Sequence, residues 1–331
     1  MPLFSFRANS GSASAHSASR VPNSLFLRPP AQYAHNIRRY TRAHRMKHVL
    51  RLLGPLLVAI GAFGFGGCTV FDPAEEIPSY VRINSISLQI NNALTEGTSS
   101  SKISDAWVYV DGQLIGAFEM PVSIPILAEG THQILVLAGI KQNGSSALRA
   151  IYPEYKGWSS TITLTRGQVL TVTPVVQYYP GTNFMWMCDF DQAGSNINDA
   201  FGPWPGRLQI ITGPAAFEQS SGYVYLNADT TEFYAQSSLP YTFNGAYDVY
   251  LEMNYSCNQG FAVGLYNTQN GEYIPWCEVN ASTSWNKIYI RLNDAILTQP
   301  PGGIYHVYIA MKKSPDVSDP WLAIDELKLI N

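Results

Sequence analysis

Short runs in which apolar and polar residues alternate recur from residue 81 to the C-terminus, and turn-forming residues separate them. "VRINSISLQI" at 81–90 is the first such run, and "IYHVYIAMKK" at 304–313 is one of the last. A period of two places successive side chains on opposite faces of a strand, so each run predicts a half-buried β-strand. Tyr, Trp, Thr, Val and Ile abound, and clean amphipathic-helix periodicity is missing. The sequence therefore predicts an all-β protein.

Residues 81–179 are expected to form a first, small β-sandwich. Asp111-Gly112 stands between alternating runs and predicts a type I′ hairpin, whose two central residues need positive φ. Glu129-Gly130 and Arg166-Gly167 mark two further turns. The string V-Y-V-D-G-Q-x-I-G, followed by L-A-E-G-x-H-x-I-x-V, resembles PEGA-like domains, which are small sandwiches of bacterial envelope proteins. That resemblance implies a fold and an envelope location, but no chemistry.

Residues 185–331 are expected to form a second sandwich. "NFMWMCDFDQAG" opens it, "PWLAIDELKLIN" closes it, and Asn270-Gly271 and Pro301-Gly302-Gly303 supply turns between its strands. Six or more short strands at this spacing predict a jelly-roll-like sandwich. The closing "IDELKLI" also resembles the last strand of carbohydrate-binding-type jelly rolls. The expected strands are 221–228, 247–256, 261–267, 273–280, 287–293 and 304–313.

The phases of these strands suggest a ligand-binding face. If four of them share one sheet, its outer face carries Tyr250, Glu252, Asn254, Trp276, Glu278, Asn280, Tyr289, Arg291, His306 and Tyr308. Sugar rings stack on Tyr and Trp, and carboxylate, amide and guanidinium groups bind their hydroxyls, so this face would suit a glycan. The competing interpretation is an ordinary solvated sheet face. Trp204 in the loop "FGPWPG" is a second aromatic candidate, with a purely structural turn as its alternative.

Two further groups of side chains are candidate sites. Asp189 and Asp191 near the first strand and Asp325 in the last offer hard oxygen ligands, which would suit a structural Ca²⁺ ion; no other cofactor is expected. Three cysteines follow Cys68, so at most one disulfide forms within the folded part; Cys257 and Cys277 are candidate partners, and the sequence leaves the pairing open.

The sequence favours binding over catalysis. Only two histidines, His132 and His306, follow Cys68, and each falls in a different expected sandwich. A Ser-His-Asp catalytic triad is therefore not expected. A glycoside hydrolase using Glu252 and Glu278 stays open as a minor alternative, because retaining enzymes need carboxyls only about 5 Å apart. After Cys68 the chain has 24 acidic and 12 basic residues, a net charge of −12 with neutral histidines. A nucleic-acid partner is therefore not expected.

The N-terminal segment predicts export and lipidation. The apolar run 52–65 has 14 residues, too few for a membrane span of roughly 20, and follows the basic "MKHVLR", so residues 46–67 match a secretory signal peptide. The tetrad FGGC resembles a bacterial lipobox, with Phe65 where that motif usually has Leu, and the resemblance assigns Cys68 as the lipidated residue. Residues 68–80 would form an acidic, proline-containing tether, and residues 1–45 are interpreted as a mis-assigned upstream extension.

These patterns lead to one main hypothesis. The start of the folded part, "EEIPSYVRINSI", resembles uncharacterised Bacteroidetes-type outer-membrane lipoproteins. We therefore expect a lipid-anchored protein of the bacterial outer membrane, on the periplasmic or the cell-surface side, with a non-catalytic role in binding or assembly. A glycan-binding module of a surface polysaccharide system and a subunit of an outer-membrane complex are the two alternatives within that class.

Overall fold

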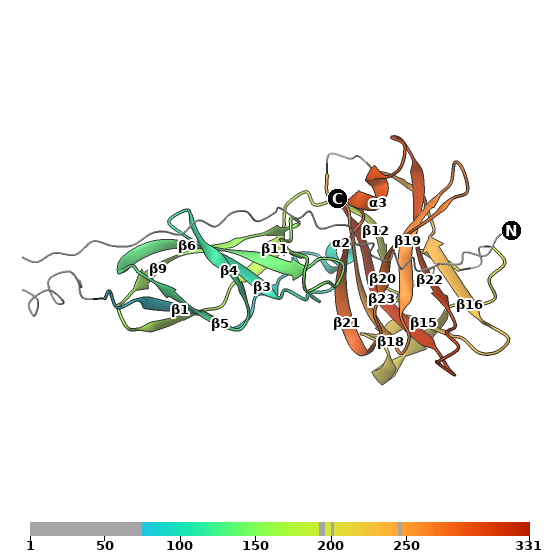
Figure 1. Ribbon diagram of the computed structural model, residues 1–331, viewed down its shortest axis with the longest axis horizontal. Coiled ribbons are helices and arrows are strands. Elements are labelled where there is room, and N and C mark those ends of the chain that lie inside the picture. Colours follow the sequence, from blue (N-terminus) through green and yellow to red (C-terminus); the bar gives the residue numbers. More distant parts are fainter. Residues whose placement is uncertain (1–74, 192–195, 200–201, 244–246) are drawn as a thin grey trace, which may run out of the picture. The chain divides into compact units, whose positions relative to one another are not determined.

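The computed structural model describes residues 75–191, 196–199, 202–243 and 247–331, which Figure 1 shows as labelled ribbons. They belong to one compact unit, Glu75–Asn331, with two hydrophobic cores. As the sequence predicts, the fold is all-β; in the described ranges only α2 (Ala93–Glu96), α3 (Asn293–Leu297) and the 3₁₀ turn η1 (Gly213–Ala215) are helical. None of these helices is long and apolar enough to cross a membrane. Residues 1–74, including the expected signal peptide and Cys68, lie outside the described ranges.

The first sandwich comprises residues 79–178 and encloses one core. Its strands are β1 (Ser79–Ile83), β2 (Ser87–Leu88), β3 (Asp105–Val110), β4 (Gln113–Glu119), β5 (Val122–Ile126), β6 (Gly130–Lys141), β7 (Arg149–Ile151), β8 (Tyr155–Lys156), β9 (Trp158–Leu164), β10 (Val169–Val172) and β11 (Val175–Tyr178). One sheet has the order β4-β3-β6-β7, with β9 also paired to β6, and two small sheets have the orders β10-β1-β5 and β2-β11-β8. The β1–β10 and β2–β11 pairs are parallel.

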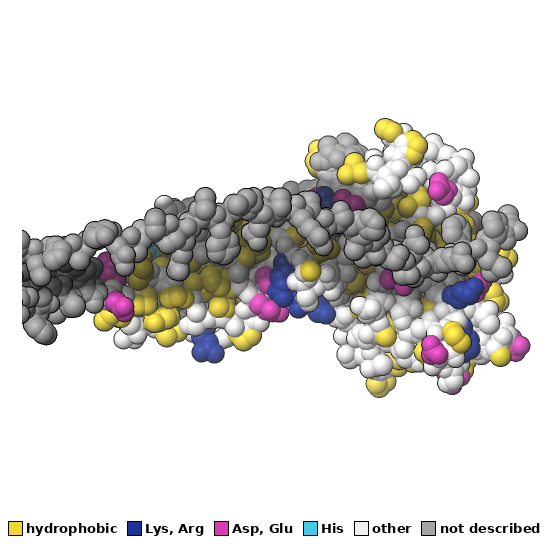
Figure 2. Space-filling model, in the orientation of Figure 1, with side chains coloured by type: hydrophobic (Ala, Val, Ile, Leu, Met, Phe, Trp, Pro, Cys, Tyr) yellow, Lys and Arg dark blue, Asp and Glu magenta, His cyan; other side chains and the backbone are white. Residues whose placement is uncertain are grey.

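The predicted turns of the first sandwich are present. Asp111 and Gly112 have φ values of 49° and 80° and join β3 to β4, as a type I′ turn requires. Gly130 and Gly167 also have positive φ, 97° and 70°, at the other two predicted turns. Figure 2 shows hydrophobic side chains gathered over this sandwich on one face. Its exposed large apolar residues include Leu114, Leu127, Val169 and Val175.

The second sandwich comprises residues 184–330 and consists of two six-stranded sheets. The β23 sheet contains β12 (Phe184–Cys188), β14 (Gln209–Thr212), β15 (Ser220–Tyr225), β18 (Tyr250–Cys257), β21 (Ser282–Arg291) and β23 (Trp321–Ile330). The β22 sheet contains β13 (Ile197–Asn198), β16 (Glu232–Ser237), β17 (Tyr241–Thr242), β19 (Phe261–Asn267), β20 (Tyr273–Val279) and β22 (Ile304–Lys312).

The strand order of the second sandwich fixes which side chains are neighbours. The β23 sheet has the order β14-β15-β23-β18-β21, and β12 also pairs with β23, so the first and last strands are adjacent. The β22 sheet has the order β13-β16-β22-β19-β20, and β17 also pairs with β22. Apolar side chains of both sheets, such as Leu251 of β18 and Val307 of β22, form the core between them. Each sheet therefore has one face turned away from that core.

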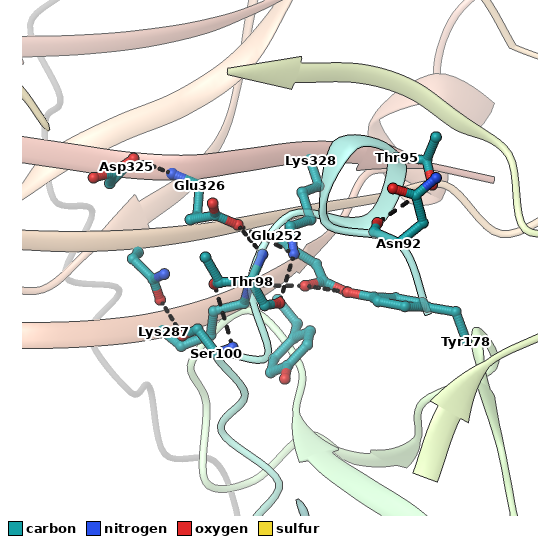
Figure 3. Close-up of polar contacts among 12 residues, drawn as sticks. Asn92, Thr95, Thr98, Ser100, Tyr178, Glu252, Lys287, Asp325, Glu326 and Lys328 are labelled. Carbon is teal, nitrogen blue, oxygen red and sulfur yellow. Dashed lines mark hydrogen bonds and ion pairs between the residues drawn. The ribbon is translucent and has the colours of Figure 1, made fainter. Parts of the chain in front are cut away.

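The first sandwich covers part of the outer face of the β23 sheet. Tyr250, Tyr289 and Ile330 of that sheet belong to the core of the first sandwich rather than to the core of the second. The Glu252 carboxylate accepts hydrogen bonds from Tyr152 Oη at 2.7 Å and Tyr178 Oη at 3.0 Å, and Figure 3 shows Tyr178 pointing at it. The contact is thus both apolar and polar. Of the two outer faces, the one on the β22 sheet carries no such cover from the described part of the first sandwich.

Candidate functional site

The ten side chains predicted to form one outer face lie on two different sheets. Tyr250, Glu252, Asn254, Tyr289 and Arg291 belong to β18 and β21 of the β23 sheet. Trp276, Glu278, His306 and Tyr308 belong to β20 and β22 of the β22 sheet, and Asn280 follows β20 directly. The assumption of a single sheet was wrong, and these residues cannot form one surface.

The five predicted residues of the β23 sheet are engaged with the protein itself. Tyr250, Glu252, Asn254 and Tyr289 are at most 2% exposed, so the expected solvated face does not exist there. Asn254 Oδ1 accepts a hydrogen bond from Ser100 Oγ, and Tyr289 Oη accepts one from the Lys102 backbone N–H. The Arg291 guanidinium pairs with Asp248 at 2.9 Å and with Asp294 at 3.5 Å.

Glu252 is the centre of a buried ionic group, here called the junction cluster, with Lys287, Lys328, Tyr152 and Tyr178. The Lys287 ammonium lies 2.8 Å from Glu252 Oε2, and both side chains are at most 3% exposed. Burial alone would raise the pKa of Glu252, but the charges of Lys287 and Lys328 outweigh it and hold that pKa below its usual value. The carboxylate is ionised, paired and sealed from solvent, which makes it a structural group.

A β-bulge explains why Trp276 departs from the predicted phase. Val263 of β19 pairs with Cys277, but the next residue, Gly264, pairs with Pro275, so Trp276 is an extra residue in β20. A bulge interrupts the alternation of side chains. Trp276 therefore packs against the core of the second sandwich, and its indole N–H donates to the Arg291 carbonyl at 2.7 Å. It does not share a surface with Glu278.

Of the predicted residues on the β22 sheet, Glu278 lines a groove on its outer face, and Tyr308 stacks on Tyr234, which also lines that groove. One register row crosses four strands of this sheet: Tyr234 of β16, Ala310 of β22, Ala262 of β19 and Glu278 of β20. Directly paired residues point to the same face, and the row spans about 14 Å at ordinary strand spacing. Because the two central residues are alanines, the surface is recessed between the larger side chains of Tyr234 and Glu278.

Aromatic rings form one wall of this groove. The Trp204 indole stacks on the Tyr234 ring with centroids 4.5 Å apart, and Tyr234 stacks on Tyr308 at 4.8 Å. A Cβ atom on Gly264 would lie 2.6 Å from the Tyr308 ring, so glycine lets that ring lie across β19. Burial raises the pKa of Tyr308 to about 12, so its hydroxyl stays neutral. The wall is therefore a rigid, preformed aromatic stack.

Charged side chains close the other borders of the groove. Lys312 pairs with Glu232 at 2.8 Å, and with Glu278 these residues place two carboxylates and one ammonium around the alanine floor. The groove has a volume of about 290 Å³. We call it the Trp204 groove; it is lined by Trp204, Glu232, Phe233, Tyr234, Gly260, Phe261, Ala262, Glu278, Ala310, Met311 and Lys312.

The aromatic surface continues beyond Tyr308. Tyr273 lies edge-on to Tyr234 at 5.1 Å and to Trp204 at 5.7 Å, and it contacts Tyr266 at 4.7 Å. Among the sequence candidates, His306 lies beside Tyr266, and its Nδ1 is 2.7 Å from the Ser237 carbonyl oxygen. Sequence reasoning missed Tyr234, Glu232 and Lys312. The alternation in "EFYAQS" could have revealed the first two, but the row that joins them to Glu278 depends on strand order.

The expected Ca²⁺ site is not formed in the described ranges, where no group of three or more His, Cys, Asp or Glu side chains could hold a metal ion. Asp325 is 2% exposed and accepts hydrogen bonds from Ser221 Oγ and the Glu326 backbone N–H, both at 2.7 Å. Burial raises its pKa to about 8. Asp189 and Asp191 follow β12 and accept backbone N–H groups instead of converging on Asp325.

Cys257 and Cys277, the candidate disulfide partners, are not bonded to each other. Both are free thiols in the core of the second sandwich, as is Cys188. Burial raises the pKa of all three thiols, to about 11 for Cys277 and about 12 for Cys188. They therefore act as small apolar core groups rather than as reactive or cross-linked residues.

The two carboxylates of the glycoside hydrolase hypothesis lie on different sheets. Glu252 lies on the β23 sheet, where it is fully buried beneath the first sandwich, whereas Glu278 is exposed on the β22 sheet. Two carboxyls must flank one glycosidic bond for either hydrolytic mechanism. These two cannot, so this version of the enzyme hypothesis is wrong.

Comparison with known proteins gives a fold likeness only. No family model and no curated protein matches the sequence. Over 45% of its length the chain resembles a family 29 carbohydrate-binding module complexed with mannohexaose, at 7% identity, 92% coverage of that chain and a TM-score of 0.32. It also resembles the family 11 carbohydrate-binding module of a cellulosomal cellulase of Clostridium thermocellum, at 14% identity, with 45% and 94% coverage and a TM-score of 0.31. Scores this low support no inference about a ligand.

Proposed function

We propose that this protein is a non-catalytic glycan-binding protein and that the Trp204 groove is its binding site. The observation that carries the proposal is the composition of that groove. The half-buried Trp204 indole, at the end of the aromatic stack, offers an apolar surface to the C–H face of a sugar ring, and the alanine floor leaves room for the ring. Glu232, Glu278 and Lys312 stand where they can bind hydroxyl groups with charge-assisted hydrogen bonds.

The burial pattern supports this site over the junction cluster. Preformed sites cost less to order on binding, and Tyr234, which is 4% exposed and stacked between Trp204 and Tyr308, holds the Trp204 indole in place. Trp204 completes the stack from a loop rather than from a strand. Its removal should therefore change the groove while leaving the sheet intact.

Affinity gel electrophoresis tests the proposal. The protein is run through gels containing hydroxyethyl cellulose, galactomannan, xylan or dextran, and retardation by at least one neutral polysaccharide is expected. Trp204→Ala should abolish the retardation. Tyr247→Ala is the matched control, since Tyr247 is 62% exposed and not part of the groove lining. Equal retardation of the wild type and Trp204→Ala would contradict the assignment of the site.

Assembly with another envelope protein is a second candidate, favoured by the exposed apolar residues of the first sandwich. Leu114, Leu127 and Val169 are 51%, 69% and 56% exposed. Figure 2 shows hydrophobic side chains gathered on one face of this sandwich, and exposed apolar surface is typical of protein contact sites. A mild-detergent pull-down that yields a stoichiometric partner would support it, provided that Leu127→Ser disrupts the complex and Trp204→Ala does not.

We also propose that the chain is anchored to the bacterial outer membrane through lipid on Cys68. The support is the signal-peptide pattern and the FGGC tetrad of the sequence. Several acyl chains together hold a protein on a membrane far more stably than one, at roughly 0.8 kcal/mol per buried CH₂ group. Cys68→Ser should release the protein from the membrane fraction or leave it unprocessed. Unchanged membrane retention of that variant would refute the proposal.

A further inference from the structure

A second cavity lies where the two sandwiches meet, and it differs in chemistry from the Trp204 groove. Its volume is about 450 Å³. The first sandwich and the segment before β3 contribute Lys102, Ser104, Lys141, Asn143 and Gly144, and the second sandwich contributes Tyr255, Glu278, Val279, Asn280, Ala281, Ser282, Ser284, Asn286, Lys287, Ile288 and Tyr289. Three of the 12 basic residues that follow Cys68 line this one cavity, which we call the lysine cleft.

The lysines of the cleft are held in place by the contact between the sandwiches. The Lys102 backbone N–H donates to Tyr289 Oη at 3.0 Å, and its ammonium donates to Asn286 Oδ1. Lys141 ends β6, and the next residue, Gln142, forms a β-bridge with Tyr289. The positions of these two side chains are thus set by backbone contacts.

Carboxylates neutralise the three lysines of the cleft only in part. Lys287 forms an ion pair with the buried Glu252, which neutralises its charge. In the part of the chain that the structure describes, the one carboxylate paired with Lys141 is that of Glu119, at 3.4 Å, which is 58% exposed and shared with Arg149. Lys102 has no carboxylate partner among the residues that the structure describes. Glu278 is the one carboxylate in the lining, and it also lines the Trp204 groove.

The two ammonium groups without strong partners repel each other. Partial burial lowers the pKa of Lys102, and the charge of Lys141 lowers it further. An anion between the two would remove that repulsion and replace it by attraction. The cleft is also lined by uncharged amide and hydroxyl side chains, those of Asn143, Asn280 and Ser284. Such neutral groups suit the hydroxyls of a ligand that carries the negative charge.

We propose that the lysine cleft binds an anionic sugar, with the ligand carboxylate between Lys102 and Lys141 and its hydroxyls on the asparagine and serine side chains. The site takes a hexuronate residue, either free or within an acidic glycan. It does not depend on the Trp204 groove, because the two cavities share only the border residue Glu278.

Calorimetric titration of the full chain with trigalacturonate, at 20 and 200 mM NaCl, tests this site. Binding is expected at 20 mM, with at least a fivefold loss of affinity at 200 mM because salt screens exposed charges. The double variant Lys102→Gln/Lys141→Gln should lose at least tenfold in affinity. Lys156→Gln, which removes an exposed charge of the first sandwich outside the cleft, should bind like the wild type.

Additional variants and ligands in the same titration distinguish this site from the Trp204 groove and from a general anion site. Glu278→Gln should strengthen trigalacturonate binding, since it removes the only carboxylate of the lining, and Trp204→Ala should leave that binding unchanged. Neutral galactotriose should not compete. Absence of trigalacturonate binding at 20 mM NaCl, wild-type affinity of the double lysine variant, or equal binding of inorganic sulfate in place of the sugar acid would each overturn the proposal.

Discussion

The junction cluster predicts an unusually large effect for one isosteric substitution, Glu252→Gln. The variant keeps the side-chain volume but removes the charge opposite Lys287, which is 3% exposed and has no other carboxylate partner in the described ranges. It also turns the hydrogen bonds from Tyr152 and Tyr178 into bonds to a neutral acceptor. Breaking one side of a buried ion pair costs about 3–5 kcal/mol, because the remaining charge stays buried and unpaired. Domains are stable by about 5–15 kcal/mol, so the loss should be severe.

Urea denaturation at pH 7 measures this effect, and the chain offers a matched control. Glu129 pairs with Arg166 at 3.0 Å, but the two side chains are 55% and 59% exposed. Glu129→Gln should therefore change the free energy of unfolding by about 0–1 kcal/mol. The double variant Glu252→Gln/Lys287→Met removes the unpaired charge and should recover part of the lost stability.

The pH dependence of unfolding gives a second readout for the same residue. The pKa of Glu252 is lowered in the folded protein, so its contribution is present above its unfolded pKa and is lost as the pH falls through the folded value. Glu252→Gln should lack that acid-dependent loss. A Glu252→Gln variant as stable as Glu129→Gln would refute the view that the junction cluster joins the two sandwiches.

Three further predictions concern single groups. Burial raises the pKa of Asp325 to about 8, so the free energy of unfolding of the wild type should fall by an amount of the order of 5 kcal/mol between about pH 4 and pH 8. Thermal unfolding of Asp325→Asn should lack this pH-dependent loss. His132 has a raised pKa because it hydrogen-bonds Asp111, and an NMR titration of Asp111→Asn should show that pKa fall. Gly264→Ala would place a Cβ atom 2.4 Å from the Ile274 carbonyl oxygen, and urea denaturation should show a loss of about 1–3 kcal/mol.

Local features of the fold could be predicted from the sequence. The Asp111-Gly112 hairpin depends on two adjacent residues that accept positive φ, and both adopt it. The alternation in β18 correctly placed Leu251 and Met253 in the core, with Glu252 on the opposite face. Periodicity of two reports which face a residue is on, and that information is contained within the strand itself.

The segment that packs over the outer face of a strand could not be predicted from the sequence of that strand. Glu252 has the sequence environment of a solvated strand residue, yet Tyr152 and Tyr178 bury it from about 100 and 74 positions away. Trp276 lies off the predicted face because a bulge is defined by pairing with the neighbouring strand, not by the sequence of the strand that contains it. The Trp204 groove likewise depends on Ala262 and Ala310 being opposite each other, which requires the strand order.

The central claim, glycan binding in the Trp204 groove, is tested most directly by calorimetric titration of the wild type, Trp204→Ala and Tyr247→Ala with the polysaccharide that retards the protein most. Saturable binding by the wild type and by Tyr247→Ala is expected, with at least a tenfold weaker affinity for Trp204→Ala, about 1.4 kcal/mol. Undiminished affinity of Trp204→Ala, or no binding of any neutral polysaccharide by the wild type, would contradict the account.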